Sequence, residues 1–405
     1  MSVDNLTPST TKKVLVFSTA YLTLIGGAEI AVKEITDRLG DFSAKGGPAS
    51  GWEFDLICAR IKKELPKRES VGRVNVFRLG WGWGKLDKLL LPWRGAALAA
   101  KLHAAGGYDL IWAIMASFGG LAALFFKNRH PQVPYLLTLQ EGDSAEHIAS
   151  RARWLGPYYK KMFTAADYLT AISQSLFDFG RKQGAVASME IVPNGVDLEK
   201  FKPEPPDLDL KNRLGLTKEE KIIITVSRLV PKNGIGDLIE AVKQLTLDDQ
   251  KTSVKLLILG SGPLEKNLKS RVKKLDLENR VLFLGSVPYD EVPKYLNLAD
   301  IFARPSLSEG LGNVFLEAMA CGLPVIATLV GGITDILYRG GIGRVGFDCK
   351  VGDPSSIADK IEVIFSLSDE QKKQLKITAR KFVEQNYQWK DIAARMKNIF
   401  TTLIK

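Results

Sequence analysis

The chain has 405 residues, 45% of them apolar and 25% charged, which is typical of a soluble globular protein long enough for two domains. A net charge of +11 favours an anionic partner such as a phosphorylated substrate, nucleic acid or a membrane surface. Three scattered cysteines, Cys58, Cys321 and Cys349, predict reduced structural thiols, and three histidines without ligand spacing argue against zinc. We see no signal region and no run of about 20 apolar residues, so we expect a cytoplasmic protein.

The first half of the chain alternates short apolar runs with helical segments, which is typical of a doubly wound parallel sheet. Residues 13–18 predict a buried strand, and after the Gly26-Gly27 turn an amphipathic helix continues to about Leu39. Glycine has no Cβ, so this turn can approach a pyrophosphate, although it lacks the GxGxxG form and a structural turn explains it equally well. Further strands are expected at 53–58, 73–78, 110–113, 135–139, 168–171 and 191–192.

A second series of strands and helices begins with KIIITVSRL at Lys221, after the proline-rich linker at 202–209. A helix at about Trp389 to Leu403, with apolar residues at helical spacing, follows the second sheet and is expected to return to the first domain. We therefore predict an N-terminal domain of residues 1–201 plus 386–405 and a C-terminal domain of residues 202–385. The strands of the C-terminal domain are expected at 222–227 (IIITVS), 254–259, 281–284, 301–304 and 324–328.

The run SLSEGLGNVFLEAMACGLPVIAT, residues 306–328, predicts a loop, a helix capped by Asn313, and a buried strand. Glu309 lies at the mouth of this helix and Glu317 within it. A helix N-terminus attracts phosphate, and carboxylates beside a phosphate need hydroxyl partners, so the run indicates a sugar phosphate or nucleotide sugar. The alternative is that both glutamates lie on a solvated helix face.

Arg228 and Lys232 follow a strand in SRLVPKNG, at the carboxyl end where parallel sheets bind ligands, and so can neutralise a diphosphate. The alternative is two solvated charges, but Pro231 and Gly234 in the same turn favour the functional interpretation. Two further turns are candidates to line a nucleotide pocket or are ordinary packing: LGSGP with Gly262, and FLGSVP with Val287.

Aromatic and basic residues cluster in two stretches, which suits a membrane interface, a lipid-linked acceptor or a sugar platform. Stacking on nucleic acid uses the same residue types, but the chain shows no nucleic-acid module. Burial is the default for each single tryptophan. The stretches are residues 151–163 and the cluster of Trp81, Trp83, Lys85, Lys88, Trp93 and Arg94.

Together these motifs resemble the retaining glycosyltransferases of GT-B architecture in family four, the glycosyl transferases group 1. The resemblance implies an α/β fold of two Rossmann-like domains that face each other across a cleft, with the donor held mainly by the second and the acceptor by the first. It covers nearly the whole chain and rests on Gly26-Gly27-Ala28-Glu29, VPNGVD at 192–197, SRLVPKNG at 227–234, SEGLGNVFLEAMACGLPVIAT at 308–328, and Gly331-Gly332 with Asp335 beyond.

The resemblance also implies roles for matching residues. Arg228 and Lys232 would hold the donor diphosphate, Glu309 the hydroxyls of the transferred sugar, and Glu317 the nucleotide ribose. Domain closure would bring Gly26 and Gly27 to the phosphates and exclude water. Transfer would retain the anomeric configuration, need no cofactor or divalent metal, and use the donor phosphate to help deprotonate the acceptor. The remaining donor-binding candidates are Gly262, Val287, Leu311, Gly312, Asn313 and Val314.

One position departs from the family pattern. Many members carry a histidine after the central strand of the first domain, where this chain has Gln140. Glutamine can hydrogen-bond a hydroxyl but cannot hold a proton near neutral pH, so the usual sugar contact changes. Glu141, Asp143 and Asn194 are further candidates for contact with sugar or acceptor.

We expect transfer of a hexose from a UDP or GDP sugar to a glycan or lipid-linked acceptor, in polysaccharide or glycolipid biosynthesis. Peripheral contact with an anionic membrane at its inner face is a further expectation, and nucleic acid is not expected as a partner. A nucleotide-sugar epimerase of similar architecture and a non-catalytic nucleotide-sugar-binding protein stay open as alternatives. The missing dinucleotide fingerprint disfavours an NAD-dependent oxidoreductase.

Overall fold

The computed structural model describes residues 11–22, 26–40, 51–143, 148, 150, 153, 155–246, 253–338 and 345–405. The chain forms two compact units: unit 1 is Met1–Glu141, Ala149–Pro193 and Trp389–Lys405, and unit 2 is Gly142–Ile148 and Asn194–Gln388. The sequence predicts boundaries at 201/202 and 385/386, which are eight and three residues from the boundaries at 193/194 and 388/389. Residues 23–25 before Gly26 and residues 151, 152 and 154 of the second aromatic-basic stretch lie outside the described residues.

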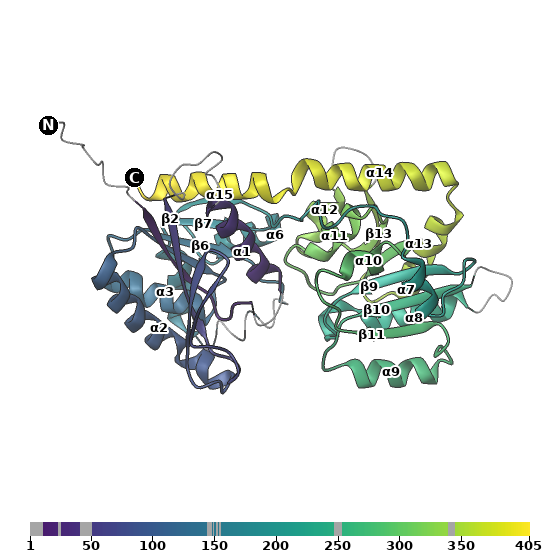
Figure 1. Ribbon diagram of the computed structural model, residues 1–405, viewed down its shortest axis with the longest axis horizontal. Helices are drawn as coiled ribbons and strands as arrows, with labels where there is room; N and C mark the ends of the chain where they lie inside the picture. The colour runs from purple at the N-terminus through teal and green to yellow at the C-terminus, as the bar shows by residue number, and fades with distance from the viewer. Residues whose placement is uncertain are drawn as a thin grey trace. The chain divides into compact units, whose positions relative to one another are not determined.

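Unit 1 contains, within its described residues, a sheet in the order β3-β4-β2-β1-β5-β6-β7-β8, parallel except for the β3–β4 pair. The strands are β1 Lys12–Phe17, β2 Trp52–Ala59, β3 Arg68–Val71, β4 Val74–Leu79, β5 Leu110–Ile114, β6 Tyr135–Leu139, β7 Tyr168–Ala171 and β8 Ser188–Ile191. The helices are α1 Gly27–Gly40, α2 Lys85–Gly106, α3 Phe118–Arg129, α5 Pro157–Thr164, α6 Gln174–Lys182 and α15 Trp389–Leu403 (Figure 1).

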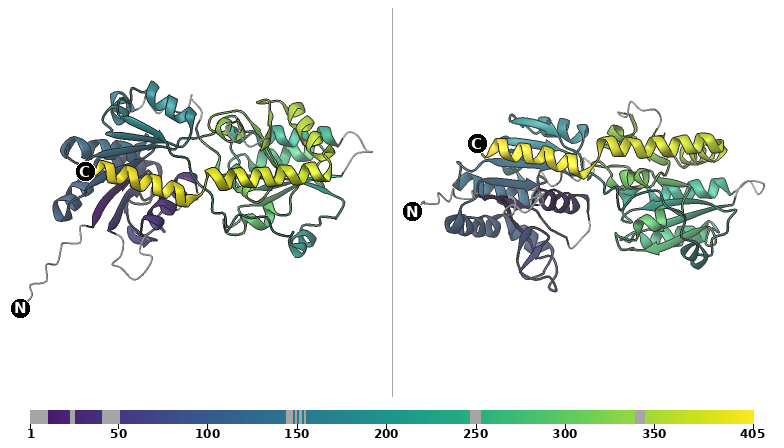
Figure 2. Two further views of the ribbon diagram at one scale, coloured as in Figure 1. Left: turned by 90° about the horizontal axis from the view of Figure 1, so that it is seen from above. Right: turned by 45° about the horizontal axis from the view of Figure 1, so that its top comes forward.

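Successive side chains of a strand point to opposite faces, so each buried strand of unit 1 serves two helix layers. Val14 and Val16 of β1 pack into one cluster with α1 and α15, while α2 and α3 pack against the other face (Figure 2). The α15 ring of Phe400 lies 5.2 Å from Trp112 of β5, in an edge-to-face arrangement. The C-terminal helix is therefore part of the unit 1 core.

Unit 2 contains, within its described residues, a parallel sheet in the order β11-β10-β9-β12-β13-β14. The chain moves outward from β9 through β10 to β11 and then returns to β12, so the strand order reverses between β9 and β12, where open α/β sheets bind ligands. The strands are β9 Lys221–Val226, β10 Val254–Leu259, β11 Val281–Gly285, β12 Ile301–Arg304, β13 Val325–Thr328 and β14 Gly346–Cys349. The helices are α7 Leu208–Arg213, α8 Ile235–Leu245, α9 Glu265–Lys274, α10 Val292–Leu296, α11 Asn313–Ala320, α12 Ile333–Tyr338, α13 Pro354–Ser366 and α14 Asp369–Asn386.

The predicted fold class of two α/β domains with Rossmann-like parallel sheets is confirmed, and the cleft between them stays a prediction. Strands β3 and β14 were not among the expected strands; β3 (RESV) is short and polar and pairs antiparallel with β4. All three cysteines are buried and free, as predicted. Among the described residues, no helix combines the length and apolar character needed to cross a bilayer.

Candidate functional site

The loop after β9 carries Arg228 and Lys232, and its shape depends on Gly234. This glycine has φ +66°, and a Cβ there would lie 1.9 Å from the carbonyl oxygen of Pro305. Only glycine allows this approach, which brings the β9 loop against the segment that follows β12. The Leu307 N–H then donates to the carbonyl of Lys232 at 2.7 Å, and the Asn233 amide donates to the carbonyl of Arg228 at 2.7 Å. The two loops at the switch point thus form one surface.

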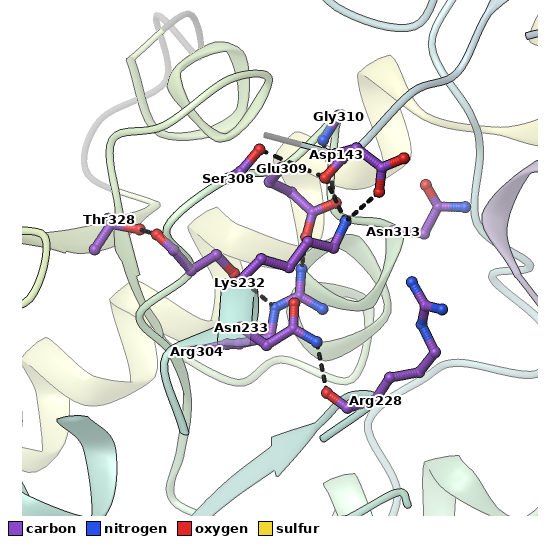
Figure 3. Close-up of polar contacts among 12 residues, drawn as sticks. Asp143, Arg228, Lys232, Asn233, Arg304, Ser308, Glu309, Gly310, Asn313 and Thr328 are labelled. Carbon is purple, nitrogen blue, oxygen red and sulfur yellow. Dashed lines mark hydrogen bonds and ion pairs between the residues drawn. The ribbon is translucent and has the colours of Figure 1, made fainter. Parts of the chain in front are cut away.

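Lys232 points into this surface, where its ammonium group donates to the Gly142 carbonyl and lies 3.9 Å from the Asp143 carboxylate. Burial lowers the pKa of Lys232, the nearby carboxylates of Glu309 and Asp143 raise it, and the cations Arg228 and Arg304 lower it further. Figure 3 shows this arrangement, with the Arg228 side chain at the lower right. Arg228 is solvent-exposed. The nearby carboxylates only partly offset the burial of the Lys232 ammonium group. A diphosphate placed here would add negative charge close to it.

Glu309 pairs with Arg304, the last residue of β12, and both side chains are largely buried. The other Glu309 oxygen, Oε1, accepts from the Gly310 N–H at 3.2 Å. The Glu309 backbone is also fixed, because Gly331 (φ +54°) approaches so closely that a Cβ would lie 1.8 Å from the Glu309 carbonyl oxygen. Glu309 is therefore held at both its backbone and its carboxylate.

Glu317 lies within α11 and is only 8% exposed. Burial raises its pKa to about 7, and the hydrogen bond from the Tyr289 hydroxyl, 3.0 Å from Oε1, partly opposes this rise. The two glutamates of the run thus differ: Glu309 is paired with a cation, whereas Glu317 accepts from a neutral phenol.

The start of α11 carries most of the remaining donor-binding candidates. Gly312, with φ +86°, is the N-cap residue, so the prediction that Asn313 caps the helix is wrong; the Asn313 side chain instead accepts from the Asn194 amide at 3.2 Å. Leu311 and Val314 are buried beside it. The structure therefore brings Asn194 to the helix N-terminus that carries Asn313.

Gly262 lies against the backbone of Leu229, where a Cβ would be 2.5 Å from the carbonyl oxygen, so it borders the Arg228 loop. Val287 follows β11 and is partly exposed. Both residues remain candidates by position.

Gly26, Gly27, Gln140 and Glu141 belong to unit 1, so their part in the site stays a prediction. Gly27 is the first residue of α1 and Gly26 precedes it, with the Ile30 N–H donating to the Gly26 carbonyl at 3.1 Å. Gln140 and Glu141 are buried after β6, and Glu141 accepts a hydrogen bond from the Ala116 N–H.

Arg304 and Tyr289 are residues of the site that the sequence analysis missed. An arginine that closes the apolar strand IFAR, at the same sheet edge as Arg228, is the signal that points to Arg304. Tyr289 carries no comparable signal, because its role depends on a contact 28 residues away. Among the described residues, no group of three or more histidine, cysteine, aspartate or glutamate side chains lies where it could hold a metal ion.

Each unit is an α/β layer structure, and in unit 2 cations and carboxylates gather where β9 and β12 end. This fold and site are those of a nucleotide-binding type of protein, and the site suits an anionic and hydroxylated ligand. Comparison with known proteins gives the family. The model of glycosyltransferase family 4 matches residues 25–200, and that of glycosyl transferases group 1 matches residues 207–397. An uncharacterised glycosyltransferase of Methanocaldococcus jannaschii is 30% identical over 402 residues, covering 93% of this chain and 94% of its own length. The chain belongs to the family 4 glycosyltransferases and has the GT-B fold.

More similar curated relatives match over shorter stretches. A GDP-mannose-dependent monoacylated phosphatidylinositol monomannoside mannosyltransferase of Corynebacterium glutamicum is 34% identical over 59% of this chain. The chain spans about 63% of that relative's length and about 61% of an N-acetyl-glucosaminyl malate synthase of Bacillus anthracis.

Solved structures show the fold. Sucrose-phosphate synthase from Thermosynechococcus elongatus superposes with a TM-score of 0.80 at 22% identity, covering 97% of this chain and 99% of that one. HepE of Anabaena, in complex with UDP and glucose, gives a TM-score of 0.75 at 23% identity, covering 96% and 100%.

Proposed function

We propose that this protein transfers a hexose from a nucleotide sugar to a glycan or lipid-linked acceptor, with retention of configuration and without a divalent metal. The observation that carries the proposal is in unit 2: Arg228 and Lys232 follow β9 close to Glu309, which precedes α11, and Glu317 lies buried within α11. Two cations suit a diphosphate, and two carboxylates suit the hydroxyls of a sugar and a ribose.

The roles follow from the burial of each group. Lys232 is partly desolvated and its pKa is lowered, so it gains most from a diphosphate, with Arg228 closing over the phosphates from its exposed position. Glu309 lies in the glycine loop before α11 and is assigned to the transferred sugar. Glu317, buried and with its pKa raised to about 7, is assigned to the ribose, with Tyr289 as its present partner.

In the proposed reaction the bond from the anomeric carbon to the diphosphate oxygen breaks, and the acceptor oxygen bonds to the same face of that carbon. The acceptor proton passes to the leaving diphosphate, so no side chain is required as general base. Negative charge grows on the departing phosphate, so cations held beside it lower the barrier. Arg228 and Lys232 lie where the donor diphosphate is proposed to bind. Gly26 and Gly27 of unit 1 are proposed to approach the phosphates.

The acceptor proposal draws on an aromatic-basic surface of unit 1, formed by the residues around the start of α2. Trp81, Trp83 and Trp93 are 44%, 56% and 59% exposed. Buried Asp87 accepts from the backbone N–H groups of Trp81 and Trp83 and so fixes the turn, while Arg94 stacks 3.9 Å over the Trp81 ring. Exposed tryptophans beside cations suit the boundary of an anionic bilayer, where a lipid-linked acceptor would be found.

The relatives indicate which ligands to test first: a lipid acceptor, and donors that carry guanosine or uridine diphosphate. The names of the Corynebacterium and Mycolicibacterium smegmatis relatives specify GDP-mannose as donor and phosphatidylinositol mannosides as acceptors. The HepE structures hold UDP or UDP-glucose.

A thermal-shift screen of UDP, GDP and their sugars, run in EDTA, tests the donor proposal, since a ligand selective for the folded state raises its melting temperature. Arg228→Ala and Glu309→Ala should each reduce the shift from the best nucleotide sugar; an undiminished shift in both would show that the site is elsewhere. Proton NMR of the first glycoside formed reports retention. Conversion of the nucleotide sugar without any acceptor would instead identify an epimerase.

A further inference from the structure

Arg304 is buried at the carboxyl end of β12, and its charge is held on three sides. Its Nε donates to the Ser306 hydroxyl at 3.1 Å, its guanidinium lies 4.8 Å over the Phe315 ring, and its terminal nitrogen pairs with Glu309 Oε2. Ser306 is itself fixed, because its carbonyl accepts from the Thr328 hydroxyl. The guanidinium is thus immobilised before it meets the carboxylate.

Arg304 is a poor candidate for holding phosphate itself. The Arg304 and Glu309 side chains are only 8% and 14% exposed, and the pair is mutually neutralising. Arg228 and Lys232 lie nearer to solvent at the same sheet edge. An apolar residue at 304 would leave the Glu309 carboxylate buried without its cation, which is costly.

The pair also distinguishes the two oxygens of Glu309. Oε2 is occupied by Arg304, whereas among the described residues Oε1 accepts only a longer hydrogen bond, from the Gly310 N–H at 3.2 Å. Oε1 also faces the Gly142 backbone, since a Cβ at Gly142 would lie 3.3 Å from it and 3.2 Å from Lys232 Nζ. Oε1 therefore points to the same small space as the Lys232 ammonium.

We propose that Arg304 positions Glu309 for binding of the donor sugar. Arg304 holds Glu309 through Oε2, so that Oε1 can accept a hydrogen bond from a sugar hydroxyl beside Lys232. This inference rests on the proposed function and adds a residue to it. It requires Arg304 to act through Glu309 and to leave the nucleoside diphosphate contacts unchanged, because Arg228 and Lys232 make those contacts independently.

The test compares two ligands on the full-length protein. Calorimetry gives the Kd of UDP and UDP-glucose, and of GDP and GDP-mannose, and the ratio of sugar-nucleotide Kd to diphosphate Kd isolates the sugar contact. Loss of a residue that orients a metal ligand typically costs 10- to 100-fold, and by analogy Arg304→Met should raise this ratio by about tenfold or more while the diphosphate Kd changes less than about threefold. Arg213→Met, at an exposed arginine of α7, is the matched control and should leave the ratio unchanged.

A double-mutant cycle separates positioning from general packing. In a Glu309→Gln background, Arg304→Met should have no further effect on the ratio, because the carboxylate it positions is gone. If Arg304→Met does not fold, Arg304→Lys is the substitute, because it keeps a positive charge beside Glu309 but lacks the planar guanidinium. Arg304→Lys should raise the ratio by about threefold. An unchanged ratio in the folded variants, or an equal rise in both backgrounds, would overturn the positioning role. If the wild-type protein binds neither diphosphates nor their sugars, the proposed function fails, and this inference with it.

Discussion

Glu317 provides a stability test that needs no ligand. Burial raises its pKa from 4.5 to about 7, so the folded protein prefers the protonated carboxyl. A folded-state pKa above the unfolded value means that the stability is fully present below pH 4.5 and is lost as the pH rises through 7. A pKa difference of about 2.5, at about 1.4 kcal/mol for each, corresponds to roughly 3 kcal/mol. Glutamine has the same shape, is neutral at every pH, and still accepts from Tyr289.

We therefore predict that Glu317→Gln and the wild type have similar free energies of unfolding at pH 4.5, and that at pH 8 the variant is more stable by roughly 3 kcal/mol. Urea denaturation followed by circular dichroism across this range measures the difference. Glu278→Gln, at an exposed glutamate of the same unit, is the control and should show little pH-dependent gain. A Glu317→Gln difference that is flat with pH, or a loss of stability at pH 8, would refute the electrostatic reasoning.

Three further predictions follow from single contacts. Because the pKa of Lys232 is lowered, Lys232 should lose its proton, and the protein its affinity for UDP or GDP, at a lower pH than an exposed lysine would. Lys232→Arg should remove this fall in affinity in a calorimetric pH series. Gly331→Ala should lower the free energy of unfolding by about 1–3 kcal/mol in urea, since its φ is +54° and its Cβ would meet the Glu309 carbonyl; a neutral result would mean that this turn relaxes freely. Phe400→Ala should cost about 3–5 kcal/mol in the same assay because its buried ring packs on Trp112, and a loss below 1 kcal/mol would contradict a core role for α15.

Much of the fold could be predicted because buried parallel strands leave a local trace. The apolar runs at β6, β7, β10 and β12 give those strands with the bounds that the structure has. Strand β3 escaped because its polar residues show neither an apolar run nor a clean alternation; it exists through antiparallel pairing with β4.

The candidate site divides in the same way. Arg228, Lys232, Glu309 and Glu317 stand in motifs at the ends of strands and at a helix, so their positions in the sequence and the family resemblance together make them candidates. The contacts between distant segments could not be predicted: Gly142 with Lys232, and Tyr289 with Glu317, are separated by 90 and 28 residues. Arg304 is only five residues from Glu309, but the two side chains meet because the chain bends after β12. That bend needs glycine at 234 and 331, where a Cβ would meet the carbonyls of Pro305 and Glu309.

Calorimetric titration of nucleotide sugars into the full-length protein in EDTA tests the central claim most directly. We predict saturable one-to-one binding of at least one of UDP-glucose and GDP-mannose, unaffected by EDTA and reduced at least about tenfold when Arg228 and Lys232 are both replaced by alanine. Binding that depends on a divalent metal, or that survives the double replacement unchanged, would contradict a metal-free diphosphate site at the carboxyl end of β9.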